Sequence, residues 1–173
     1  MSTQPIQKGN RGFGEHHPAY WVAIAAIVML SLWIRMDDLR AWSRQSHRAF
    51  HHNQPILLNF DGYFYLSMAR DLLEGRYDAL DELRGVPEPQ KRPVPPPMIS
   101  LITATIAAIT PFSLDWIATL LPVFLGVTLA IPLYLFSRLY GGGWMAAVAI
   151  CVGLCSRYYV YRSNVGWFDT DCL

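Results

Sequence analysis

Residues 116–136 read WIATLLPVFLGVTLAIPLYLF, and this stretch decides the class of fold. It carries no charged side chain and is long enough to cross a hydrocarbon core of about 30 Å as a helix. Pro122 and Pro132 lie inside it, and neighbouring helices can satisfy the backbone groups that a proline leaves free in a bilayer. We therefore expect a transmembrane helix here.

Two further uncharged stretches extend this pattern. Ala19–Ile34 is of spanning length, and we expect Arg35 at its end to snorkel towards the headgroups. Residues 140–156 are at the short end of what can cross, and the glycines of residues 137–143 suit a tight turn between antiparallel helices. The chain is 53% apolar, 16% charged and nearly neutral, a composition that favours a membrane protein over a soluble domain.

The apolar segment Met98–Thr110 decides the topology. Prolines at 93 and 95–97 precede it and Pro111 follows, which leaves about 13 helical residues, or roughly 20 Å. Because that length does not cross a bilayer, we interpret the segment as an interfacial or re-entrant helix. Asp61 and Asp169 then lie on one face of the membrane, whereas an additional crossing would separate them.

The predicted architecture is an all-α polytopic membrane protein with three spans. Its parts are an N-terminal tail (1–17), transmembrane helix 1 (18–37), a first external loop with amphipathic helices (38–113), transmembrane helix 2 (114–138), a cytoplasmic turn (139–143), transmembrane helix 3 (144–162) and the start of a second external loop (163–173).

Two acidic features are candidates for chemistry. Residues 167–171 read WFDTD, and the carboxylates of Asp169 and Asp171 offer the oxygen ligands that Mg²⁺ or Mn²⁺ prefers. Taken alone this pair is a weak signal, because acidic pairs are common in loops. Asp61 occupies the position of a helix N-cap before an amphipathic run that Gly75 can stop, and a cap leaves part of its acceptor capacity for a cation.

Basic and polar residues of the first loop have more ordinary interpretations. Arg40, Arg44 and Arg48 place a basic stripe on one face of a predicted helix, either at the lipid headgroups or in a site for an anionic substrate. Solvated side chains are expected at the histidine pairs 16–17 and 51–52, and on the face formed by Arg70, Asp71, Glu74 and Arg76. Residues 78–97 are predicted to be an irregular connection, and no basic tract indicates a nucleic-acid partner.

In this order, the motifs resemble the start of the catalytic subunit of oligosaccharyltransferase, the bacterial PglB and STT3 family. The resemblance rests on Asn59-Phe60-Asp61-Gly62-Tyr63, Ala69-Arg70-Asp71, Thr110-Pro111-Phe112-Ser113, Ile131-Pro132, Tyr158-Tyr159, Arg162 and Gly166-Trp167-Phe168-Asp169-Thr170-Asp171. It implies the GT-C membrane fold. It also implies transfer of an oligosaccharide from a lipid-pyrophosphate donor to asparagine in the N-x-S/T sequon of an acceptor polypeptide, with Mg²⁺ or Mn²⁺ as the metal.

The resemblance also implies roles for four residues. Asp61 matches the aspartate of the family's first loop, near both the metal and the acceptor amide, while Asp169 and Asp171 match its metal-binding pair. Arg162 matches the arginine that steadies the acidic cluster. We therefore expect Asp61 and Arg162 to be catalytic, and Asp61, Asp169 and Asp171 to bind the metal.

Two departures from the family pattern bear on function. Trp167-Phe168 stands where bacterial relatives usually carry two tyrosines. Family members are also several times longer, with further spans, a second large loop that bears a metal-binding glutamate, and a C-terminal domain that binds the sequon. We therefore expect an N-terminal fragment that is inactive alone.

The resemblance implies a multi-pass protein of the bacterial inner membrane with its active site facing the periplasm, in contact with membrane lipid. All but three of the 14 Lys and Arg would then be external, against the positive-inside rule, from which long loops are partly exempt. The alternatives are another GT-C enzyme that uses a lipid-phosphate sugar, a transporter fragment and a non-catalytic membrane scaffold.

Overall fold

A computed structural model describes residues 18–78, 80–81 and 87–172. The predicted tail 1–17, with its histidine pair, lies outside the described residues. The elements in chain order are α1 (Pro18–Arg44), α2 (Ser46–Ala49), β1 (Phe50–His51), β2 (Gln54–Pro55), α3 (Phe60–Leu73), β3 (Leu80–Asp81), β4 (Gln90–Lys91), α4 (Met98–Ile109), α5 (Leu114–Thr128), α6 (Ala130–Leu154), α7 (Arg157–Arg162) and the 3-10 turn η1 (Thr170–Cys172).

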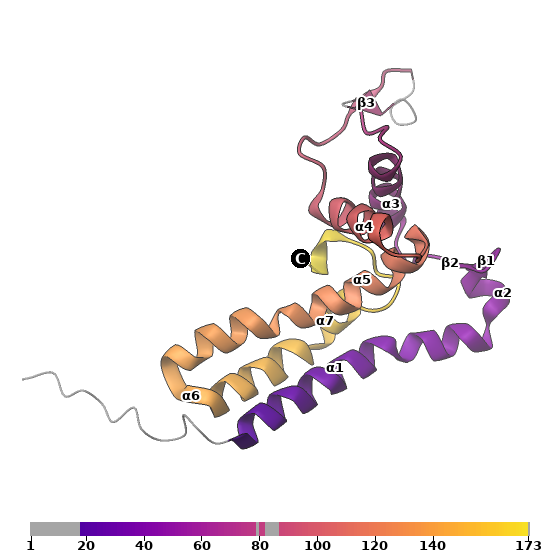
Figure 1. Cartoon of the computed structure of the whole chain (residues 1–173). Helices are drawn as coiled ribbons and strands as arrows, with labels where there is room; N and C mark the ends of the chain where they lie inside the picture. The colour runs from indigo at the N-terminus through magenta and orange to yellow at the C-terminus, as the bar shows by residue number, and fades with distance from the viewer. Residues whose placement is uncertain (1–17, 79, 82–86, 173) are drawn as a thin grey trace, which may run out of the picture.

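The long apolar helices form one layer. Figure 1 shows α1, α5 and α6 side by side, while α3 and α4 stand together at the end of this layer. Within the described residues, two helical stretches are long and apolar enough to cross a membrane, Pro18–Arg44 and Leu114–Leu154. The predicted helical membrane architecture is confirmed at this level.

The stretch Leu114–Leu154 reverses direction at its glycines. Gly141 and Gly142 have non-helical backbone angles, and Gly142 has a φ of 72°, a left-handed value that glycine adopts without steric cost. Figure 1 shows the chain turning back at this point of α6. A Cβ on Gly143 would lie 2.8 Å from the ring of Tyr20, so the start of α1 packs directly against the turn.

Arg35 does not snorkel. Its side chain is fully buried, and its Nε donates to Ser163 Oγ at 2.9 Å. Its two terminal nitrogens donate to the carbonyl oxygens of Ser31 at 3.2 Å and Leu154 at 3.1 Å. Because carbonyls at a helix C-terminus have no intrahelical partner, the Leu154 carbonyl is a ready acceptor at the end of α6. Arg35 therefore joins α1 to both α6 and the segment after α7.

Helix α4 is short and packs on α3 and α5. It has 12 residues, which gives a length of about 18 Å, and it begins directly after Pro97. A hydrophobic cluster holds these helices together. Its buried members are Leu57, Leu66, Ile99, Ala118, Leu121 and Phe168. Phe168 belongs to residues 167–171 (WFDTD), which we call the acidic motif, so this cluster also anchors that motif. The side of the membrane on which the motif lies stays a prediction.

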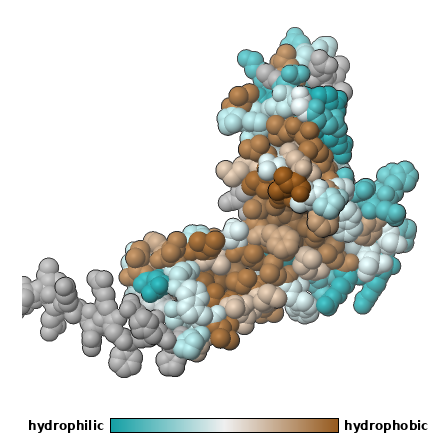
Figure 2. All heavy atoms as spheres, viewed as in Figure 1, coloured by the Kyte–Doolittle hydropathy of each residue, from teal (hydrophilic) through white to brown (hydrophobic). Residues whose placement is uncertain are grey.

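The surface divides into apolar and polar regions. Figure 2 shows hydrophobic residues over much of the helical layer, with hydrophilic residues over α2 and the far end of α3. The predicted basic stripe lies at the first of these polar regions, but not on one helix. Arg40 and Arg44 end α1, the chain turns at Gln45, and Arg48 belongs to α2.

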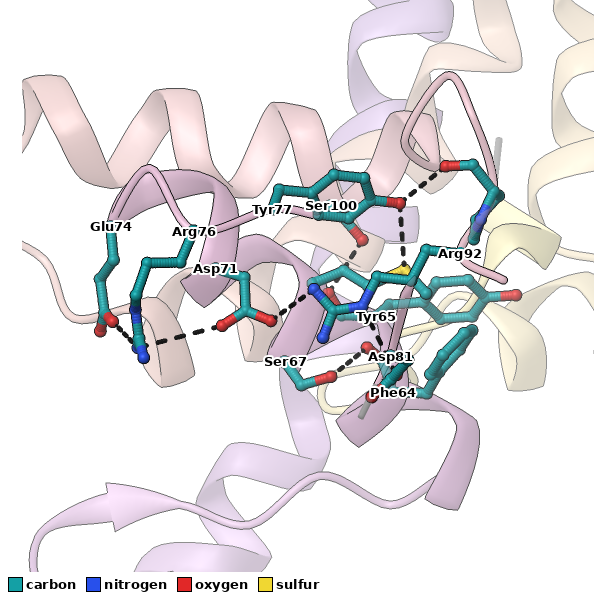
Figure 3. Close-up of polar contacts among 12 residues, drawn as sticks. Phe64, Tyr65, Ser67, Asp71, Glu74, Arg76, Tyr77, Asp81, Arg92 and Ser100 are labelled. Carbon is teal, nitrogen blue, oxygen red and sulfur yellow. Dashed lines mark hydrogen bonds and ion pairs between the residues drawn. The ribbon is translucent and has the colours of Figure 1, made fainter. Parts of the chain in front are cut away.

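The segment 78–97 has more structure than the sequence indicated. The described strands β3 and β4 pair within it, and Arg92 ties it to α3 (Figure 3). One terminal nitrogen of Arg92 lies 2.8 Å from Asp71 Oδ2, and its Nε lies 3.5 Å from Asp81 Oδ2, an ion-pair distance without hydrogen-bond geometry. Asp71 is therefore not part of a simple solvated face. Burial lowers the pKa of Arg92, but both carboxylates raise it, and their net effect is upward.

Candidate functional site

The start of α3 differs from the prediction in its capping residue. Asn59 is the N-cap, and its Oδ1 accepts a hydrogen bond from the Asp61 backbone N–H at 3.0 Å. Asp61 lies in the first turn of the helix, where a negative charge is favourable, and it is exposed. The Asp61 carboxylate is therefore not the helix cap, and Asp61 lies at the surface in the first turn of α3.

The segment that leads into the acidic motif is fixed by its backbone. The Gly166 N–H donates to the Thr119 carbonyl of α5 at 2.9 Å, and the Gly166 carbonyl accepts from the Leu58 N–H at 3.0 Å. Gly166 has a φ of 79°, and a Cβ there would lie 2.6 Å from the Trp42 ring. Any side chain at this position would clash with the Trp42 ring and would strain the left-handed backbone. Glycine is therefore required for the close contact between residue 166 and Trp42.

Two segments distant in sequence meet at the motif. Asn59 Nδ2 donates to Asp169 Oδ2 at 2.8 Å, and a Cβ on Gly62 would lie 2.9 Å from the Phe168 carbonyl oxygen. The other oxygen of Asp169 accepts from the Thr170 N–H at 2.7 Å. The acidic motif therefore lies directly against the first turn of α3.

The second carboxylate of the motif has a cationic partner. A terminal nitrogen of Arg162 lies 2.6 Å from Asp171 Oδ2, and the guanidinium stacks on the Trp167 ring at 5.1 Å. The pair is about half exposed, so its contribution to stability is small, on the order of 0.2–1 kcal/mol. Its geometric effect is to hold Asp171 near the end of α7.

Comparison with known protein families gives a match that includes the motifs described above. The family described as oligosaccharyl transferase STT3, N-terminal, matches residues 20–173. The chain belongs to this family. The GT-C membrane fold implied by the sequence resemblance is thereby confirmed. The STT3 match includes α3, the acidic motif, α5, α6 and all of α1 except its first two residues.

The curated relatives of this STT3 chain include two glycotransferases. Each is named undecaprenyl-diphosphooligosaccharide–protein glycotransferase, and they come from Campylobacter jejuni serotype O:2 and strain RM1221. Each is 27% identical over 132 residues, which cover 76% of this chain and 17% of the relative. The matched part of this chain therefore spans about one sixth of the length of either relative.

In the structure, the four predicted site residues form two pairs. Asp61 and Asp169 are linked through Asn59, and Arg162 is paired with Asp171. Within the described residues, no three His, Cys, Asp or Glu side chains form a group that could hold a metal ion. Mg²⁺ is often held by one or two carboxylates together with substrate phosphate, so the donor chemistry fits such an ion. The metal roles stay predictions.

Asn59 and Gly166 are site residues that the sequence interpretation missed. The signal for Asn59 was present, because asparagine ranks with aspartate among helix N-caps and stands two residues before Asp61. The requirement for Gly166 depends on Trp42, whose ring comes from the end of α1. That approach is tertiary, so no local pattern indicates it.

Proposed function

We propose that this STT3 chain supplies the acidic part of the active site of a membrane oligosaccharyltransferase. The proposed reaction transfers an oligosaccharide from a lipid-pyrophosphate donor to asparagine in an N-x-S/T sequon. The proposal is supported by family membership and by one observation above all. Asn59 bonds both the Asp61 backbone and the Asp169 carboxylate, so the first loop and the acidic motif meet.

The chemistry of the residues suits this reaction. A bound Mg²⁺ or Mn²⁺ would stabilise the negative charge that develops on a pyrophosphate leaving group. We assign the holding of that ion to the carboxylates of Asp61, Asp169 and Asp171, which the ion and the donor pyrophosphate would draw together, since these side chains form no ligand group by themselves in the described residues. Arg162 keeps Asp171 in place through its ion pair, and the Asp61 carboxylate is exposed where it can accept from an acceptor amide N–H. Such a hydrogen bond would weaken the conjugation that makes an amide nitrogen a poor nucleophile.

The proposed setting is the bacterial inner membrane, with the acidic motif on the periplasmic face. The name of the Campylobacter relatives supports an undecaprenyl-diphosphate carrier as the donor lipid and a protein as the acceptor. Family membership favours this function over a lipid-phosphate sugar enzyme, a transporter or a scaffold.

Direct Mn²⁺ binding tests the assignment. We expect the chain in detergent to bind Mn²⁺, detected by electron paramagnetic resonance, and to lose that binding in Asp169→Asn. Asp37→Asn is the matched control, because Asp37 is an exposed acid that pairs with Arg40 at 3.7 Å on α1. Unchanged Mn²⁺ binding in Asp169→Asn would reject the metal role.

Transfer activity tests the function itself. With each substitution placed in the natural gene, a sequon-bearing reporter protein should lose glycosylation in Asp61→Asn and Asp169→Asn and keep it in Asp37→Asn. The Asp61→Asn defect should persist at saturating Mn²⁺, because an interaction with the reacting amide is lost together with a ligand. Normal glycosylation in both site variants, at normal protein abundance, would reject the proposal.

A further inference from the structure

The Asn59 side chain makes two hydrogen bonds that point to different segments. Its Oδ1 accepts from the Asp61 backbone N–H at 3.0 Å, and its Nδ2 donates to Asp169 Oδ2 at 2.8 Å. The reversed amide would face the Asp61 N–H with a donor and the Asp169 carboxylate with an acceptor. Both contacts would then be unfavourable, so the surroundings allow one orientation of this amide.

The bond from Asn59 holds a carboxylate that is also held from its other side. Asp169 Oδ1 accepts from the Thr170 N–H at 2.7 Å, while Oδ2 faces Asn59. Donors on both oxygens fix the position and the plane of the carboxylate. Thr170, within the motif, bonds Oδ1 through its N–H at 2.7 Å and its Oγ1 at 3.4 Å, and Asn59, 110 positions earlier, bonds Oδ2.

Neighbouring contacts hold the two backbones together but do not orient the carboxylate. The Leu58 N–H donates to the Gly166 carbonyl at 3.0 Å, and Gly62 packs against the Phe168 carbonyl. These contacts bring the segments side by side. Asn59 adds the side-chain bond that sets where Asp169 lies relative to the first turn of α3.

We propose that Asn59 is a positioning residue that fixes the Asp169 carboxylate relative to Asp61. The catalytic meaning of this inference rests on the proposed function, but its geometric content does not. Asparagine suits the role because Asn, Asp and Ser are comparable helix N-caps, and only asparagine also carries an N–H group for a carboxylate. Aspartate at this position would place a like charge beside Asp169, and serine lacks the reach.

The test measures the geometry in the full 173-residue chain without metal. Nitroxide labels are attached at Ser67→Cys in α3 and Thr170→Cys in η1, both exposed, after the native cysteines are replaced by serine. Pulsed electron paramagnetic resonance then gives the distribution of distances between the labels. We expect one narrow peak with Asn59 and a broader distribution in Asn59→Ser and Asn59→Asp. Both substitutions keep the cap but lose the side-chain bond to Asp169, while the contacts of Leu58 and Gly62 keep the two segments adjacent.

An exchange of the two residues separates positioning from general stability. In Asn59→Asp combined with Asp169→Asn, the new amide at 169 can donate to the new carboxylate at 59, so the narrow peak should return. Asn164→Ser is the matched control, because Asn164 Nδ2 donates to Asp38 of α1 at 3.2 Å, so this substitution removes a side-chain bond to a different carboxylate and should leave the peak unchanged. A narrow peak in both Asn59→Ser and Asn59→Asp would overturn the inference, and so would failure of the exchange to restore it.

Mn²⁺ binding, measured on the same samples, distinguishes this inference from the proposed function. The exchanged variant should keep the narrow peak and lose Mn²⁺ binding, since position 169 then bears a neutral amide. A parent chain that shows the narrow peak and the Asn59 dependence, but binds no Mn²⁺, would reject the metal assignment and leave the positioning role of Asn59 in place.

Discussion

The Arg35 guanidinium donates from Nε to Ser163 Oγ at 2.9 Å, joining the first apolar helix to the segment that enters the acidic motif. The same side chain reaches the Leu154 carbonyl at the end of α6. Planar guanidinium groups carry five donors in a fixed fork, so one arginine can bridge three elements. The position of the motif therefore depends on a residue buried within the helical layer.

Arg35→Met should destabilise the chain by about 3 kcal/mol, because buried acceptors left without a donor cost roughly 1–3 kcal/mol each. Arg35→Lys should recover part of the loss, since an ammonium cannot reproduce the fork. Thermal unfolding in one detergent measures both effects. Arg44→Met, at an exposed position of the same helix, is the control and should change the midpoint little. Equal midpoints for Arg35→Met and Arg44→Met would contradict the bridging role.

Gly62→Ala should displace the acidic motif. The added Cβ would lie 2.9 Å from the Phe168 carbonyl oxygen and 3.2 Å from Leu57 Cδ1. Overpacking costs about 1–3 kcal/mol, which outweighs a gain of up to about 1 kcal/mol in helix propensity. A lowered unfolding midpoint checks this, with exposed Ser67→Ala in the same helix as the reference. A raised unfolding midpoint for Gly62→Ala would show that the segment around Phe168 can move away from α3 without loss of stability.

The two aromatic residues of the motif should respond differently to tyrosine. Trp167 Nε1 is buried without a hydrogen-bond partner in the described part of the chain, so Trp167→Tyr removes an unsatisfied donor and should cost less than about 1 kcal/mol. Phe168 is fully buried, and Phe168→Tyr should cost about 1–3 kcal/mol because it buries a hydroxyl. Comparing the two unfolding midpoints tests this order. The opposite order would refute the packing argument.

Arg92→Gln should release the segment 78–97 from α3. The Arg92 side chain is 9% exposed and meets carboxylates on both sides, so the loss of its charge leaves Asp71 and Asp81 without their shared partner. Limited proteolysis of the segment should become about tenfold faster, which corresponds to about 1.4 kcal/mol of opening free energy. Arg76→Gln, on a side chain that is 66% exposed, should keep the parent rate. Equal cleavage rates for Arg92→Gln and the parent chain would show that Arg92 does not hold this segment against α3.

Cysteine labelling tests the predicted membrane topology. With residues 151, 155 and 172 changed to serine, Phe60→Cys and Thr170→Cys should both react with an impermeant thiol reagent in intact spheroplasts. Phe60 is 92% exposed, so a cysteine at this position would be accessible to the reagent. Leu139→Cys near the glycine turn should react after the membrane is opened. Labelling of one loop position alone would place α3 and the motif on opposite faces.

The sequence predicted what depends on local pattern. The apolar runs, the glycine turn near Gly142 and the short helix between prolines follow from composition and backbone preference, and the structure has all three. Burial of Arg35 was not predictable in this way, because two of its three partner residues lie 119 and 128 residues away. The pairing of Arg92 with Asp71 is likewise tertiary, because it depends on how the chain around Arg92 lies against α3.

The sequence named candidate residues for the site, and their roles stay predictions, but it did not show which contacts connect them. The motif resemblance named Asp61, Asp169 and the arginine that the structure pairs with Asp171, whereas the local sequence pattern assigned the helix cap to Asp61, which the structure gives to Asn59. Asn59 and Asp61 are both good capping residues, and the sequence offers no means of choosing between them. The structure shows that Asn59 is the cap: its Oδ1 accepts from the Asp61 N–H while its Nδ2 donates to Asp169.

Phe168 has a consequence for how the acidic motif responds to ionic strength. Its burial contributes about 1.5–3 kcal/mol, more than an exposed ion pair such as Arg162 with Asp171. Salt screens exposed charges over about 3 Å at 1 M, whereas it does not weaken apolar burial in the same way. Concentrated salt should therefore loosen Asp171 from Arg162 while Asp169, next to its aromatic anchor, keeps its place against α3.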